Sequence, residues 1–217
     1  MGRDIIDVYD RSIFEMRNVF TTEECKMFID YHEQSPNKHR GGLISGASTT
    51  ESYDGNIKRS IDVNLNNTQH IAFKKYIEGV KKVSKEYKRH IRDINRECGM
   101  RIDDTEGFTY PKIQRTGKGD FFNWHSDYCK ERLIAVIIYL NDIDEENGGS
   151  TEFNSGRKVQ PETGKVLMFP TTDLHLHRGN TILNGPSKYI LSGFIIVPDI
   201  VLEKQLTERV GVPFIFK

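Results

Sequence analysis

His125, Ser126 and Asp127 form a His-x-Asp sequence whose outer side chains are typical metal ligands. In a strand or at its end, residues i and i+2 point to the same side, so an imidazole nitrogen and a carboxylate oxygen can converge on one ion. A second histidine from a distant strand would complete the facial arrangement of two histidines and one carboxylate used by non-haem iron sites. Because a lone His-x-Asp sequence also arises by chance in a surface turn, the assignment needs support elsewhere in the chain.

Two further histidines and a lysine supply that support. His175 and His177 follow the strand-like run Val166–Pro170, and either could be the third ligand on residue type alone. Lys188 stands at the start of the apolar run Tyr189–Val197. Burial of an unpaired ammonium is costly, so an anionic ligand would explain this lysine, as would a side chain that reaches solvent at the strand's edge.

Composition sets the broad class of protein. The 217 residues include 31 Lys plus Arg and 31 Asp plus Glu, which gives no electrostatic reason to expect nucleic acid or a membrane surface as partner. No apolar run approaches the ~18 residues of a membrane span, and the N-terminus lacks a signal-peptide pattern. Cys25, Cys98 and Cys129 form no disulfide framework, so a reducing, cytoplasmic location is expected.

The first hundred residues predict a mixed α/β support. Ile5–Tyr9 is typical of a short strand, and Arg40–Asn56, rich in small polar residues, of a mobile loop. Thr21 and Glu24 form a capping box, which predicts a helix that ends before Ser35-Pro36. The apolar face of this first helix would be Cys25, Phe28, Ile29 and His32.

A strand and a long helix are expected next. Apolar residues at positions 61, 63 and 65 alternate with polar ones, which predicts a half-buried strand with Asp62 on its solvent side. A helix is predicted over about Thr68–Glu97, with lysines on its solvated face. Its apolar side would consist of Ile71, Tyr76, Val80, Val83, Tyr87, Ile91 and Ile94.

From Phe108 onward, short strands separated by turn residues predict an α+β protein whose core is a double-stranded β-helix of jelly-roll or cupin-like type. The helices of the first half would support this core. The candidate strands are Phe108–Arg115, Phe121–His125, Arg132–Asn141, Ser150–Phe153, Arg157–Gln160, Gly164–Phe169 and Tyr189–Val197. A single domain over 1–217 is expected, with support and a lid loop in 1–105, the catalytic core in 106–200 and an extension in 201–217.

Several motifs in this half occur in an order that resembles the 2-oxoglutarate/Fe(II) dioxygenases of prolyl 4-hydroxylase type. The resemblance runs from about Ile113 to Val197. The motifs are Asn123–Asp127, Tyr139–Asp142, Gly148–Phe153, Gly164–Pro170, His177–Gly179, Gly185 and Lys188-Tyr189.

The resemblance implies that the iron ligands are His125, Asp127 and His177. The family has a glycine two residues after its distal histidine, and Gly179 fits only His177. His175 is the competing choice and is expected to contribute to packing around the ligands.

The resemblance also implies a site for the far carboxylate of 2-oxoglutarate. Lys188 matches the family's basic residue, and Ser192 and Tyr139 match hydroxyl groups that contact the same carboxylate. Thr116 stands where many relatives have a tyrosine, and its shorter side chain departs from the pattern. Arg132 matches a basic residue that faces the substrate in some relatives, although a surface role at the strand end is equally consistent.

The implied activity is hydroxylation of a C–H bond, with Fe(II), 2-oxoglutarate and O2 as cofactor and cosubstrates and ascorbate as reductant. The favoured substrate is a prolyl residue in a peptide or protein. Alternatives are a free amino acid or other small metabolite as substrate, a catalytically silent jelly-roll binding domain, and a Zn or Mn cupin-like isomerase. The short chain suggests a bacterial or virus-infected host cytoplasm.

Overall fold

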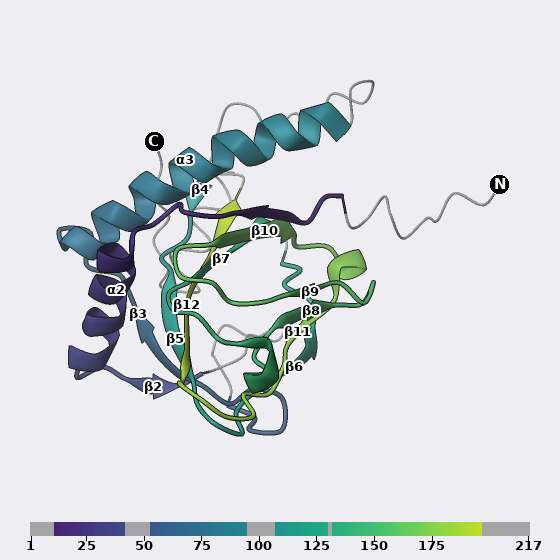
Figure 1. The fold of residues 1–217 in the computed structure, drawn as a ribbon. Coiled ribbons are helices and arrows are strands. Elements are labelled where there is room, and N and C mark those ends of the chain that lie inside the picture. The colour runs from purple at the N-terminus through teal and green to yellow at the C-terminus, as the bar shows by residue number, and fades with distance from the viewer. Residues whose placement is uncertain (1–10, 42–52, 95–106, 130–131, 197–217) are drawn as a thin grey trace.

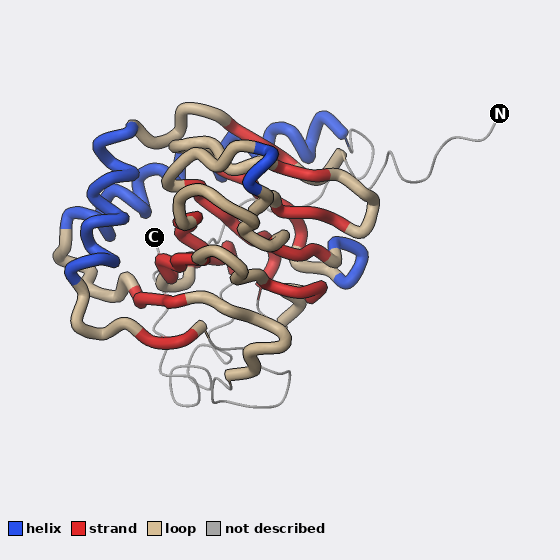
Figure 2. The backbone as a smooth tube through the Cα atoms, turned by 60° about the horizontal axis from the view of Figure 1, so that its bottom comes forward, coloured by secondary structure: helices blue, strands red, loops and turns tan. Residues whose placement is uncertain are grey.

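Two antiparallel β-sheets form the centre of the protein, and two helices cover one face of the larger sheet (Figure 1). The computed structural model describes residues 11–41, 53–94, 107–129 and 132–196. Viewed as a tube, the strands occupy the middle of the molecule and the helices its margin (Figure 2). This arrangement agrees with the predicted α+β class, a jelly-roll core with helical support.

The larger sheet has eight strands, seven of them in the order β1-β10-β7-β12-β5-β3-β2, with β4 paired to β12. Its strands are β1 (Phe14–Met16), β2 (His39–Arg40), β3 (Ile61–Asn64), β4 (Gly107–Phe108), β5 (Lys112–Thr116), β7 (Arg132–Tyr139), β10 (Val166–Pro170) and β12 (Lys188–Ile196). The smaller sheet has the order β6-β11-β8-β9. Its strands are β6 (Phe122–His125), β8 (Thr151–Phe153), β9 (Lys158–Val159) and β11 (His177–Gly179).

Alternation along the central strands divides the core into two layers. On β7, Val136 and Ile138 face the helices, whereas Ala135 and Ile137 face the smaller sheet. Successive strand residues point to opposite faces, so each strand contributes to both layers. The layer between the sheets holds Phe153 and Ile137, and Ile137 lines the cavity described below.

The predicted boundaries of the first helix are confirmed. Helix α2 spans Thr22–Gln34, Thr21 and Glu24 form the capping box, and Ser35 is the C-cap. Helix α3 spans Ile71–Ile94 and so begins three residues later than predicted. The reason is local. His70 Nδ1 accepts a hydrogen bond from the Ala72 N–H at 3.1 Å, so the His70 side chain caps the helix at this point.

Two sequence predictions about burial were wrong. Ile71 is 54% exposed, because it lies in the first turn of α3. Asp62, expected on the solvent side of β3, is fully buried because Lys58 and Ser60 satisfy its carboxylate. The buried side of α3 does contain Tyr76, Val80, Val83, Tyr87 and Ile91, as predicted.

The seven predicted strands of the second half all appear, with shifted ends. Phe108–Arg115 is divided between β4 and β5, because residues 109–111 leave the ladder. Three short strands, β1, β2 and β11, were not predicted. The predicted strand Ile5–Tyr9 and most of the predicted loop Arg40–Asn56 lie outside the described residues.

Short 3-10 helices complete the described secondary structure. The first, η1, spans Glu145–Asn147 between β7 and β8, and the second, η2, spans Asp173–His175 between β10 and β11. The second ends two residues before His177 and therefore sets where β11 begins.

Candidate iron and 2-oxoglutarate site

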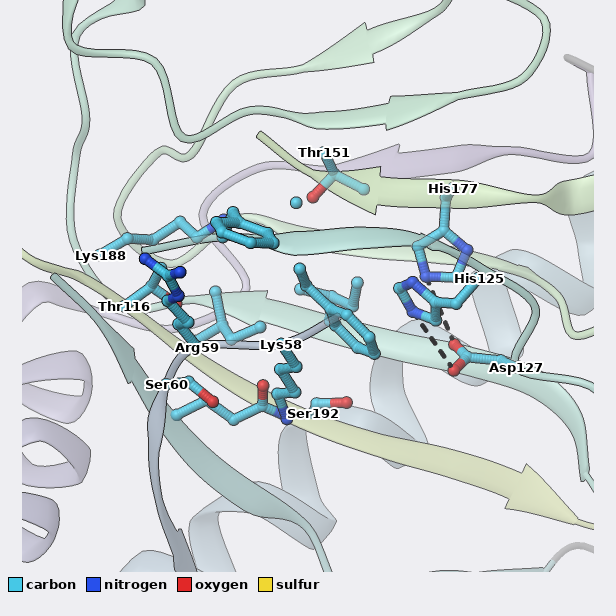
Figure 3. A pocket seen from close by; sticks show the side chains of 16 residues that line it. Lys58, Arg59, Ser60, Thr116, His125, Asp127, Thr151, His177, Lys188 and Ser192 are labelled. Carbon is cyan, nitrogen blue, oxygen red and sulfur yellow. Dashed lines mark ion pairs between the residues drawn. The ribbon is translucent and has the colours of Figure 1, made fainter. Parts of the chain in front are cut away.

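The structure brings His125, Asp127 and His177 together at the paired ends of β6 and β11. The two strands are antiparallel, and His125 and His177 are direct partners in their register. One ligand atom from each of the three side chains lies within 4.8 Å of the others. His125 Nε2 is 3.9 Å and His177 Nε2 3.6 Å from the carboxylate oxygens of Asp127 (Figure 3). The two sequence-distant segments therefore meet through strand pairing.

Backbone carbonyls fix the orientation of both imidazoles. His125 Nδ1 is 2.8 Å from the carbonyl oxygen of Asn123, and His177 Nδ1 is 3.1 Å from that of His175. A carbonyl only accepts, so each Nδ1 carries the proton and each Nε2 has a lone pair directed toward Asp127. This is how metal-ligating histidines are usually held.

The environment of His125 favours its neutral, ligating form. Burial, and secondly the neighbouring His177, lower the pKa of His125 to about 4. The ring of Phe122 stacks on His125 with centroids 3.5 Å apart. Phe153 and Phe169 surround His177 on the other side. Two imidazoles and one carboxylate are a donor set that suits Fe(II) and leaves positions free on one side.

His175 takes no part in this cluster of ligand atoms. Its buried ring lies between Ser12 Oγ, at 2.7 Å, and Thr172 Oγ1, at 2.9 Å. Its backbone carbonyl orients His177 instead. The structure thus gives the two histidines different positions, with His177 at the metal cluster and His175 behind it.

A cavity extends from the three ligands between the two sheets. It encloses about 580 Å³ of empty space, including its open mouth. Its wall includes residues from both sheets and from the segment before β3 (Figure 3). The lining residues are Lys58, Arg59, Ser60, Gln114, Thr116, Phe121, Phe122, His125, Asp127, Ile137, Thr151, His177, Gly179, Lys188, Ile190 and Ser192.

Lys188 provides a buried positive charge in this wall. Its Nζ donates a hydrogen bond to the Gly149 carbonyl at 2.8 Å, and no carboxylate among the described residues lies within ion-pair distance. Burial lowers the pKa of Lys188 to about 8. A Cβ on Gly179 would lie 3.6 Å from Nζ, so glycine there keeps space open beside the ammonium. The combination fits a site for an anion supplied by a ligand.

Two predicted hydroxyl groups line the same cavity. Thr116 on β5 is the register partner of Lys188 on β12, so their backbones are adjacent. Ser192 lies four residues further along β12 and also lines the cavity.

Tyr139 and Arg132 lie elsewhere. The Tyr139 hydroxyl is buried and donates to Thr151 Oγ1 at 2.8 Å, so Thr151 presents the hydroxyl at the cavity wall. The Arg132 guanidinium lies 3.9 Å from the centroid of the Phe194 ring, at the far end of β7 from Tyr139. The predicted contact of Tyr139 with a carboxylate would therefore act through Thr151.

Sequence reasoning missed the segment from Lys58 to Asp62. Lys58, Arg59 and Ser60 line the cavity, and Asp62 lies buried behind them. The available signal was an aspartate between Ile61 and Val63, with a lysine and a serine close before it in the sequence. Its meaning depends on the pairing of this segment with β6, which no local pattern reveals.

Comparisons with known proteins agree with this site. Residues 111–196 match the model of the 2OG-Fe(II) oxygenase superfamily, and this segment contains all three candidate iron ligands. A search of curated proteins found no significant match. The similarity to this superfamily therefore lies in the segment that contributes most of the candidate site.

Solved structures of prolyl hydroxylases share the fold. A viral collagen prolyl hydroxylase from Paramecium bursaria Chlorella virus-1, in complex with 2OG, is 18% identical (TM-score 0.60; 86% of this chain and 97% of that chain covered). A Pseudomonas putida prolyl-4-hydroxylase is 15% identical (TM-score 0.65; 88% and 97% covered). A Trichoplax adhaerens prolyl hydroxylase, in complex with a hypoxia inducible factor peptide fragment, is 14% identical (TM-score 0.67; 89% and 87% covered). The predicted jelly-roll fold is confirmed.

Among the described residues, neither helix combines the length and apolar character that a membrane crossing requires.

Proposed function

We propose that this protein is an Fe(II)- and 2-oxoglutarate-dependent dioxygenase that hydroxylates a prolyl residue in a peptide or protein. The observation that carries the proposal is a single cavity with His125, Asp127 and His177 in one part of its wall and the buried Lys188 in another. A cosubstrate with a metal-chelating group and a distant carboxylate fits this pair of features.

The residues divide between two tasks. His125, Asp127 and His177 would hold Fe(II) through Nε2 and carboxylate atoms, and the Asn123 and His175 carbonyls keep the imidazoles oriented. Lys188 would pair with the far carboxylate of 2-oxoglutarate. When bound, the iron and 2-oxoglutarate supply the activation of O2 that C–H hydroxylation requires.

Two hydroxyl side chains would support Lys188. Thr116 and Ser192 line the same cavity and can donate hydrogen bonds to a carboxylate. Ascorbate is proposed as the reductant that returns idle enzyme to the Fe(II) state. A cytoplasmic location is also proposed, and it is consistent with the reduced thiol of Cys25.

A prolyl substrate is supported by the structural neighbours, two of which are named as prolyl hydroxylases from a virus and a bacterium. The peptide bound by the Trichoplax neighbour favours a polypeptide as substrate. Exposed aromatic side chains flank the metal ligands, with Trp124 42% and Tyr128 66% exposed. Such side chains are common where a polypeptide docks.

A coupled-turnover assay tests the proposal. Purified protein with Fe(II), ascorbate and 2-oxoglutarate should form succinate faster when proline-containing peptides are added, and each peptide should gain one oxygen atom by mass. Asp127→Ala should abolish both signals, with a circular dichroism spectrum that still shows the fold. Succinate formation at the wild-type rate in Asp127→Ala would contradict the ligand assignment. If only free amino acids accelerate succinate formation, the result would favour a small metabolite as the substrate.

A further inference from the structure

A buried ion pair lies in the wall of the cavity, outside the segment that matches the superfamily model. Lys58 Nζ donates to Asp62 Oδ2 at 2.9 Å, and Ser60 Oγ donates to Asp62 Oδ1 at 2.7 Å. All three side chains are almost completely buried, yet Lys58 and Ser60 line the cavity. Burial of an ion pair seldom adds net stability, so stability alone does not account for this pair.

The backbone holds Lys58 rigidly beside the metal-binding strand. Lys58 forms a bridge with Phe122, and the Arg59 and Asn123 N–H groups bond to the Phe121 and Ile57 carbonyls at 2.8 Å. Lys58 Nζ lies 5.1 Å from the centroid of the Phe122 ring, which itself stacks on His125. The ammonium is therefore one aromatic ring away from an iron ligand.

Gly41 closes the cluster from the other side. A Cβ at this position would come within 2.1 Å of Ser60 Oγ and 2.9 Å of Lys58 Cε. The Gly41 N–H also bonds to the Ser60 carbonyl at 2.9 Å. Close approach of this backbone leaves Lys58 little freedom other than to remain against Asp62.

The two lysines of the cavity thus differ in charge balance. Lys188 has no carboxylate partner among the described residues, whereas Asp62 already neutralises Lys58. An ammonium has three N–H donors, and Lys58 donates one of them to Asp62. A neutral pair with spare donors suits an uncharged acceptor such as an amide carbonyl. A second carboxylate at this pair would instead bring a negative charge that the neutral pair does not compensate.

We propose that Lys58, neutralised by Asp62, is a specificity-determining residue that donates a hydrogen bond to an amide carbonyl of the substrate and so selects a residue within a polypeptide over a free amino acid. This inference rests on the proposed function, because it assigns the substrate class of the same site. In Figure 3, Lys58 is drawn between the part of the wall that holds Lys188 and the part that holds His125 and Asp127. A substrate in this cavity would share its wall with Lys58, Lys188 and the three candidate ligands.

The test compares an N-acetylated, C-amidated prolyl peptide with free L-proline. Lys58→Met removes the donors but keeps most of the side-chain volume. It should raise the KM for the blocked peptide at least tenfold and leave the KM for 2-oxoglutarate within twofold. Lys165→Met is the matched control, since Lys165 is also buried and paired with acids but does not line the cavity. It should leave both KM values unchanged.

A second variant reverses the charge balance. Asp62→Asn retains a hydrogen-bonding side chain but leaves Lys58 with an unpaired charge, so it should shift the ratio of kcat/KM toward free L-proline by tenfold or more. An unchanged peptide KM in Lys58→Met, an unchanged ratio in Asp62→Asn, or a wild-type preference for free L-proline would overturn the role of Lys58 while hydroxylation still stands. Wild-type protein that turns over 2-oxoglutarate with neither substrate would overturn the prolyl assignment itself.

Discussion

Two buried lysines, Lys165 and Lys188, lie at the starts of β10 and β12, the two strands that flank β7 in the larger sheet. The two lysines have different partners. Lys165, just before β10, lies 2.7 Å from Glu162 and 3.4 Å from Glu15. Lys188, the first residue of β12, has only the Gly149 carbonyl among its described hydrogen-bond partners. The protein satisfies one charge internally and leaves the other for a ligand. An unpaired buried cation in a cavity wall is thus a stronger sign of an anion site than burial alone.

Removal of the unpaired cation should have the largest effect on cosubstrate binding. Lys188→Met is expected to raise the 2-oxoglutarate concentration needed for half-maximal turnover about 100-fold, because loss of a buried charged partner costs about 2–5 kcal/mol. Steady-state succinate formation measures this effect. If this concentration rises less than threefold, Lys188 does not bind 2-oxoglutarate, and the two lysines do not differ in function.

Removal of the paired cation should instead affect stability. Lys165→Met is expected to lower the free energy of unfolding by about 1–2 kcal/mol, since Glu15 and Glu162 lose a partner but remain partly exposed to water. Urea unfolding followed by circular dichroism measures the loss. The KM for 2-oxoglutarate should stay at its wild-type value, and a large increase would show that both lysines serve the cavity.

The pH dependence of stability should reveal the buried, unpaired charge of Lys188. The pKa of Lys188 is lowered by burial from 10.5 to about 8, so between these values the unfolded chain binds more protons than the folded one. The cost of holding this charge is fully present below pH 8 and is relieved as the pH rises from 8 toward 10.5. In the absence of 2-oxoglutarate, Lys188→Met should therefore be more stable than wild type by up to about 3 kcal/mol at pH 7.

That difference should shrink as the pH approaches 10. Unfolding free energies of wild type and Lys188→Met, measured in parallel from pH 7 to pH 10, give the comparison. A difference in unfolding free energy that stays constant with pH would mean that burial does not lower the pKa of Lys188. With Fe(II) present, a 2-oxoglutarate concentration that saturates only the wild type should stabilise the wild type more than Lys188→Met.

The hydroxyl groups of Thr116 and Ser192 in the cavity wall should give the smallest effects. Thr116→Val and Ser192→Ala each remove one hydrogen-bond donor from the cavity wall and are expected to raise the KM for 2-oxoglutarate about 3- to 10-fold, corresponding to about 1 kcal/mol. Thr151→Val is a useful comparison, because its hydroxyl accepts the Tyr139 hydrogen bond at the same wall. If Thr151→Val has the larger effect, Tyr139 acts on the cosubstrate through Thr151.

The sequence predicted the features that depend on local pattern. The capping box of α2 and the seven strand segments follow from residue types a few positions apart, and these were found in the structure. The His-x-Asp pair and Lys188 also stood out by type and position. Among the residues proposed for the site, these are the ones whose side-chain chemistry is hardest to explain by packing alone.

Features that depend on long-range pairing were missed. Asp62 has the sequence environment of a solvent-facing strand residue, yet it is buried because Lys58 and Ser60 satisfy its carboxylate. Lys58 is in turn paired with the sequence-distant Phe122. The three-residue strand β11 is too short for a periodic signal, although it carries His177. Likewise, the Tyr139 hydroxyl donates to Thr151 because the two sheets face each other there, and no local sequence pattern indicates this contact.

The most direct test of the account is anaerobic difference absorption of the protein with Fe(II) and 2-oxoglutarate. Chelation of the iron by 2-oxoglutarate should produce a weak visible charge-transfer band in wild type and in Lys165→Met. The band should be absent in Asp127→Ala and should require a much higher 2-oxoglutarate concentration in Lys188→Met. Absence of the band in folded, iron-loaded wild-type protein would contradict the central claim and favour a silent jelly-roll binding domain.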